Sequence, residues 1–90
     1  MRLAHAKRRD ANEPEIVEAL LAVGATVEYS DSIDLIVGFR GKNYLIEVKN
    51  PKGRNKIEPR QKELIEEWGG QYGIARNPTE ALLIIGAIAT

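Results

Sequence analysis

Asp34, Glu47 and Lys49 are the residues of this chain whose types and spacing are best suited to chemistry. The run of residues 43–49 has the composition of a strand, in which successive side chains point to opposite faces of the sheet. Glu47 and Lys49 therefore share one face, so that a carboxylate and an ammonium project together. The preceding run of residues 33–39 is apolar and β-branched, as a second strand requires, and Asp34 stands at its head.

The connection between these two runs predicts that the two carboxylates meet. Residues 40–42 form a short, glycine-bearing link of the kind that joins hairpin strands, which would place Asp34 across the pair from Glu47. Two acidic oxygen donors beside a lysine suit a hard cation such as Mg²⁺, and the lysine is left to handle a water or a phosphate. An exposed strand face with an ordinary Glu/Lys pair is the alternative, because an isolated Glu-x-Lys is a weak motif. The aspartate in the first strand and Glu-Val-Lys in the second favour the metal site.

A helix before the strands offers a third carboxylate. It is predicted to run from residue 12 or 13 to residue 23, capped by Asn12, with Pro14 in its first turn and Gly24 as its stop. Four residues set its apolar face: Ile16, Val17, Leu20 and Leu21. Glu13 lies at the centre of that face, at spacings of three, four and seven residues from its members. A first-turn glutamate can simply serve the helix dipole, worth about 0.3–1 kcal/mol; the alternative is a third ligand over the metal.

The remaining strands and the second helix follow from turn signals. Residues 25–30 read as a first strand, and residues 71–75 as a fourth that lies parallel to a neighbour after a helical crossover. Between them, a basic loop with no periodicity leads to a helix over about residues 58–68, which has Pro59 in its first turn and ends at two glycines.

Gln61 is the polar member of the apolar face of this second helix. It shares that face with Leu64, Ile65 and Trp68, at helical spacing, and so should face the sheet. A buried glutamine needs hydrogen-bond partners, which Lys49 or a water on the metal would supply. A glutamine that only caps backbone groups is the alternative.

A last helix is predicted to open at Asn77, with Pro78 at its first position and Glu80 reaching back in a capping box. Residues 81–88 are apolar nearly all round. Such a helix is either deeply packed or part of a subunit interface.

The composition fits one small globular domain. The chain has 90 residues, 43% of them hydrophobic and 29% charged, and a domain of this size is marginally stable alone, so that dimerisation would help it. No cysteine is present and His5 is the single histidine, which rules out thiolate sites and most zinc sites. No stretch is long and apolar enough to span a bilayer and no secretory signal is evident, so a cytoplasmic protein is expected, without a membrane partner.

The net formal charge of zero conceals two basic segments. Residues 1–10 hold four basic side chains against one acidic, and residues 49–62 hold six against one. Clustered positive charge beside a candidate metal site is what a phosphate backbone would select. Short basic runs are also common on solvated loops, and that alternative stays open on charge alone.

The runs from Asp34 to Gly38 and from Leu45 to Lys49, followed by Gln61, resemble the active-site pattern of the PD-(D/E)XK nuclease superfamily. They are most similar to its small VRR-NUC branch, the virus-type replication and repair nucleases. The resemblance takes in Arg9 to Glu13 at the head of the first helix and extends to the last helix. Ile33 stands where the family usually has proline, a change that removes a backbone constraint but no chemical group.

The resemblance implies a small restriction-endonuclease-like α/β fold in the order α-β-β-β-α-β-α, with a mixed sheet flanked by helices. Residues 11–90 would form this single domain and residues 1–10 a basic N-terminal arm. It also implies an enzyme that hydrolyses DNA phosphodiester bonds with Mg²⁺ or Mn²⁺. The implied metal ligands are Glu13, Asp34, Glu47 and the carbonyl of Val48.

The implied roles of the other residues are equally specific. Lys49 would orient or deprotonate the attacking water, and Gln61 would hold that network in place. Six basic residues would grip the DNA backbone without reading its sequence: Arg8, Arg9, Lys52, Arg54, Lys56 and Arg60.

Stand-alone members of this branch resemble structure-specific resolvases that act as dimers, because symmetric incision of a four-way junction needs two sites related by a two-fold axis. By this analogy the substrate is branched DNA and the protein is a homodimer. Two rival functions remain. One is a nuclease-like module that binds nucleic acid or a protein without cutting, and the other is a subunit associated with a phage helicase, which would bind no divalent metal.

Overall fold

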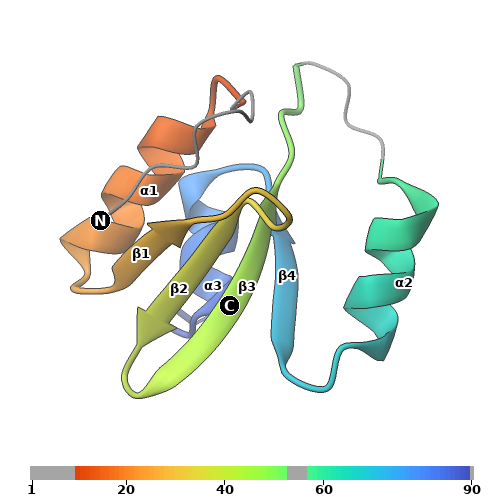
Figure 1. Cartoon of the computed structure of the whole chain (residues 1–90). Helices are drawn as coiled ribbons and strands as arrows, with labels where there is room; N and C mark the ends of the chain where they lie inside the picture. Colours follow the sequence, from red (N-terminus) through yellow and green to blue (C-terminus); the bar gives the residue numbers. More distant parts are fainter. Residues whose placement is uncertain (1–9, 53–56, 90) are drawn as a thin grey trace.

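The predicted order of elements is confirmed in the computed structural model, which describes residues 10–52 and 57–89 (Figure 1). Within them the chain forms an α/β fold in the order α-β-β-β-α-β-α. The elements are α1 (Glu13–Ala22), β1 (Thr26–Tyr29), β2 (Leu35–Phe39), β3 (Lys42–Val48), α2 (Pro59–Glu67), β4 (Gln71–Ala75) and α3 (Pro78–Ile84).

The four strands form one mixed sheet in the order β1-β2-β3-β4. The first three strands pair antiparallel to one another, and β4 lies parallel to β3, as the helical crossover predicts. The β2–β3 connection is one residue shorter than predicted, because Lys42 already pairs with Phe39. Arg40 and Gly41 make the two-residue turn, with φ of 50° and 80°, which is the left-handed backbone that such hairpin turns require.

One face of the sheet is covered by helices. Leu35, Val37, Ile46 and Val48 alternate along β2 and β3 onto this face and pack with residues of α1 and α3 in the hydrophobic core. By the same alternation, Glu47 points to the opposite face. Figure 1 shows α3 behind the sheet, α1 on the side of β1, and α2 standing apart beside β4.

Two predictions about helix ends are wrong. The Asn12 side chain makes no capping bond to α1, because it is engaged elsewhere in the fold. The last helix does not reach residue 88: α3 ends at Ile84, and Gly86 follows with φ of 76°. Leu82, Ile84 and Ala87 pack against the core.

The start of α3 agrees with the prediction in its main feature. The Asn77 side chain accepts a hydrogen bond from the Glu80 backbone N–H at 2.8 Å. The Glu80 carboxylate reaches back one residue further than a capping box would, to the Arg76 N–H at 2.8 Å. Among the described residues, no helix has the length and apolar character needed to cross a membrane.

Candidate active site

Three acidic side chains are withdrawn from solvent in a domain whose core is otherwise apolar. Glu13, Asp34 and Glu47 are 3%, 6% and 4% exposed, and they are the buried charged residues of the described part of the chain. Burial of a carboxylate is costly unless it is hydrogen-bonded, paired or bound to a metal. These are the same three residues that the motif resemblance predicts as side-chain ligands of the metal.

Asp34 and Glu47 lie at the same end of neighbouring strands and on the same face. Leu35 pairs with Ile46, and continuing this antiparallel register by one residue sets Asp34 opposite Glu47, as predicted. The Asp34 Oδ2 atom accepts a hydrogen bond from the Val48 backbone N–H at 2.8 Å. This bond fixes the aspartate against the peptide that follows Glu47.

Lys49 follows directly after β3 and is half-buried. Its Nζ atom donates to the Gln61 Oε1 atom at 2.9 Å, so the predicted partnership of these two side chains is present. The same Oε1 atom accepts from the Glu58 N–H at 3.2 Å, which means that Gln61 also takes part in the cap of α2. Gln61 therefore caps the helix and also bonds the lysine. It is half-buried, and α2 has no buried residue, so the prediction of a buried glutamine is wrong.

Tyr72 is a member of this cluster that the sequence analysis missed. It pairs with Leu45 across the parallel β3–β4 ladder and so shares the face that carries Glu47. Burial, followed by the negative charge of Glu47 and then that of Asp34, raises the pKa of the Tyr72 phenol above its ordinary value. The Trp68 and Tyr72 rings pack edge to face, with a centroid distance of 6.4 Å.

The coupling between Tyr72 and Glu47 gives a testable pKa shift. Replacing Glu47 with glutamine removes the negative charge and should lower the pKa of Tyr72, although burial keeps it above the ordinary value of about 10. NMR titration of the tyrosine ring carbons measures this directly. Glu28→Gln, at an exposed glutamate of β1, is the control and should leave the titration unchanged. An identical Tyr72 titration in wild type and Glu47→Gln would refute the coupling.

Glu13 belongs to a different element, the first turn of α1. The neighbouring Asn12 side chain bonds to the carbonyl of Lys49 at 3.0 Å, which places the first turn of α1 at the end of β3. Within residues 10–52 and 57–89, no three acidic or histidine side chains converge closely enough to form a complete metal cage. The structure thus buries Glu13 at this end of the fold without grouping it into such a cage.

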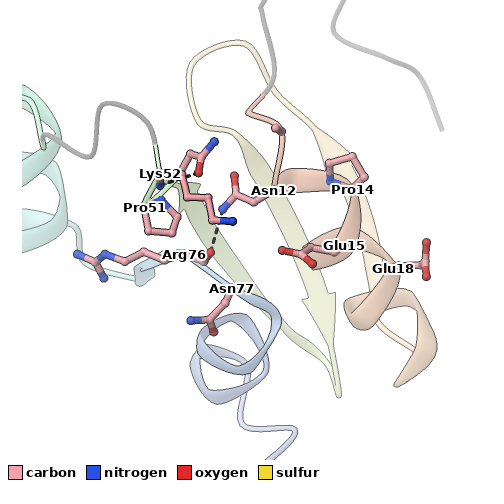
Figure 2. Close-up of a pocket in the computed structure, with 10 residues that line it drawn as sticks. Asn12, Pro14, Glu15, Glu18, Pro51, Lys52, Arg76 and Asn77 are labelled. Carbon is pink, nitrogen blue, oxygen red and sulfur yellow. Dashed lines mark hydrogen bonds between the residues drawn. The ribbon is translucent and has the colours of Figure 1, made fainter.

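Two of the six predicted DNA-contacting residues can be placed. Lys52 and Arg60 are exposed, while Arg8, Arg9, Arg54 and Lys56 lie outside the described residues, as does most of the predicted N-terminal arm. Lys52 borders an open hollow of about 600 Å³ that is also lined by Asn12 and Asn50, but by none of the three buried acids. Figure 2 shows Lys52 and Arg76 on one side of it and Glu15 on α1 facing them.

Comparison of the chain with protein-family models, with curated proteins and with solved structures gave no match.

Proposed function

We propose that this chain is a divalent-metal-dependent DNA nuclease of the PD-(D/E)XK type, most similar to the VRR-NUC branch. The observation that carries the proposal is the burial of Glu13, Asp34 and Glu47, the three residues that the motif assigns to the metal. A random surface match of the motif would leave these acids in solvent, where Asp and Glu usually lie.

The donor set fits Mg²⁺ or Mn²⁺. Carboxylate oxygens are the ligands that hard cations prefer, and the Val48 carbonyl would be a further oxygen donor beside Asp34 and Glu47. Such an ion, when bound, supplies neutralisation of charge at the scissile phosphate and a lower pKa for the attacking water. Glu13 would complete the set from α1, which requires its carboxylate to turn toward the strand end.

The protein's own groups provide the rest of the chemistry. The Lys49 ammonium, which donates to Gln61 at 2.9 Å, would orient the attacking water and stabilise negative charge as it develops on the phosphate. An ammonium can donate hydrogen bonds but cannot ligate a cation unless it is deprotonated, so the lysine acts beside the metal ligands and is not one of them.

The basic residues would hold the DNA. Lys52 and Arg60 are exposed on the loop and helix that follow Lys49, and contacts from such side chains to phosphates would position the backbone independently of sequence. Branched DNA, cut by a homodimer, is the substrate that the VRR-NUC resemblance favours. Leu21 and Ile88, which are 50% and 40% exposed, supply apolar surface on and after the helices α1 and α3, which contact each other.

A cleavage panel tests this function. Labelled four-way junction, flap, single-stranded and duplex DNAs of matched sequence are incubated with the protein and Mg²⁺, Mn²⁺, Ca²⁺ or EDTA. We expect incision with Mg²⁺ or Mn²⁺, highest on branched DNA, and none with EDTA. Sedimentation equilibrium on the same sample should report a dimer.

The outcomes of the panel separate the rival functions. If the protein binds DNA without metal and makes no incision, the result favours a non-catalytic binding module over a nuclease. Neither binding nor cutting would favour a helicase-associated subunit. If the protein cuts DNA as a monomer, the proposal of paired incision at junctions is ruled out, and nicking by a single site remains.

A further inference from the structure

Asn12 spans the ends of two parallel strands with one side-chain amide. Its Nδ2 atom donates to the Lys49 carbonyl at 3.0 Å and to the Arg76 carbonyl at 2.9 Å. Figure 2 shows the second of these bonds. Lys49 and Arg76 are the residues that directly follow β3 and β4. The partners are 37 and 64 residues away in the chain, so this is a tertiary link and not a local cap.

In both of these bonds the Asn12 amide acts as a hydrogen-bond donor. Both hydrogens of Nδ2 face carbonyl oxygens, which can only accept, so an oxygen in that position would be repelled. The orientation of the amide is therefore fixed by its partners. A residue chosen for a helix cap would instead turn its oxygen toward the helix N–H groups, and Asn12 makes no such bond.

This link fixes two functional residues relative to each other. Glu13 is the next residue along the chain, at the first position of α1, and Lys49 is one of the two bonded residues. The backbone around Lys49 is also held on its other side, because the Lys49 N–H donates to the Ala75 carbonyl at 3.1 Å and the Val48 N–H donates to Asp34. Asn12 thus adds a bond at the Lys49 carbonyl to a backbone segment that β4 and Asp34 already hold.

We infer that Asn12 is a positioning residue of the nuclease site, which joins the helix that carries Glu13 to the strand ends that carry Lys49. The inference rests on the proposed function. Asn12 touches neither DNA nor the reacting atoms in this role, and it acts by setting the distance between the carboxylate on α1 and the groups on β3.

The matched control for this inference lies at the other end of the same two strands. The Gln71 side chain, at the start of β4, donates through Nε2 to the Asn43 carbonyl near the start of β3, at 2.9 Å. It is also a bond from a side-chain amide to a backbone carbonyl of the β3–β4 pair, but a single exposed one, and it lies far along the ladder from Lys49. Both variants lose a bond from a side-chain amide to a backbone carbonyl, but only the Asn12 variants lose it next to Lys49.

The experiment compares Asn12→Ala, Asn12→Asp and Gln71→Ala with wild type. We expect both Asn12 variants to lose about 10²-fold in the single-turnover cleavage rate, because small displacements of catalytic groups have effects of this size. Their KM for DNA should stay unchanged, and their affinity for Mn²⁺, measured by calorimetry without DNA, should fall. Asn12→Asp preserves the shape of the side chain but directs a carboxylate at two carbonyls, so it should be at least as impaired as Asn12→Ala.

Gln71→Ala should retain the wild-type rate and Mn²⁺ affinity. If the Asn12 variants match Gln71→Ala in rate and Mn²⁺ affinity, or if Asn12→Asp behaves as wild type, Asn12 is a structural residue only and the inference is overturned while the nuclease stands. If wild type itself neither binds Mn²⁺ nor cuts DNA, the proposed function fails and this inference fails with it.

Discussion

Replacing Lys49 with alanine is expected to lower the single-turnover cleavage rate by about 10²-fold or more, in the range observed when a proton-transfer or charge-stabilising group is lost. Affinity for Mn²⁺ and for DNA should stay near the wild-type values, because the ammonium is not a metal ligand. Rapid-quench cleavage at saturating protein separates the chemical step from binding. Lys42→Ala, at an exposed lysine at the far end of β3, is the matched control and should cut normally.

Gln61 gives this prediction a second test. Its Oε1 atom accepts from Lys49 Nζ at 2.9 Å, so its contribution to cleavage should pass through the lysine. Gln61→Ala should slow cleavage in wild type but have little further effect in Lys49→Ala, which is the signature of two residues that act as a unit. A wild-type cleavage rate in Lys49→Ala would show that the lysine has no catalytic role and is only a charged residue at a strand end.

Replacing Asp34 with asparagine is expected to abolish Mn²⁺ binding and to reduce cleavage by about 10²-fold or more, because a ligand charge is removed from a site that neutralises phosphate. The fold should survive. The asparagine oxygen can still accept the hydrogen bond that the Val48 N–H donates at 2.8 Å. Calorimetry with Mn²⁺ and thermal melting followed by circular dichroism report the two quantities separately.

Asp31→Asn is the control for Asp34→Asn, since Asp31 is an exposed aspartate in the same loop. It should bind Mn²⁺ and cut DNA as wild type does. Unchanged Mn²⁺ binding in a folded Asp34→Asn protein would remove Asp34 from the metal site.

The pairing of Asp34 with Glu47 could be predicted because its determinants are local. Two apolar strands joined by a short turn that contains Gly41 can pair in only a few registers. A shift of one residue would move the buried apolar side chains to the solvent-facing side of the sheet. The burial of Glu13 was predictable for a similar reason, since helical periodicity alone sets it on the apolar face of α1.

Asn12 and Tyr72 show where sequence reasoning failed. An asparagine before a helix has the local preferences of a cap, and only the packed fold reveals two carbonyl partners far along the chain. Tyr72 joins the cluster through the register of the parallel β3–β4 pair. No tight turn sets that register, because a long crossover connects the two strands. The end of α3 was misplaced because residues 81–88 carry no polar break and Gly86 alone marks the stop.

Paramagnetic broadening by Mn²⁺ tests the central claim most directly, because it locates the bound ion without requiring any cleavage. In a ¹⁵N-resolved spectrum of the wild-type protein, substoichiometric Mn²⁺ is predicted to broaden first the amide signals of Asp34, Glu47 and Val48, with Glu13 close behind. Exposed glutamates of α2, such as Glu63 and Glu66, should be affected only at much higher concentrations. Broadening that begins at those exposed glutamates, or none at millimolar Mn²⁺, would contradict a metal site formed by the buried carboxylates.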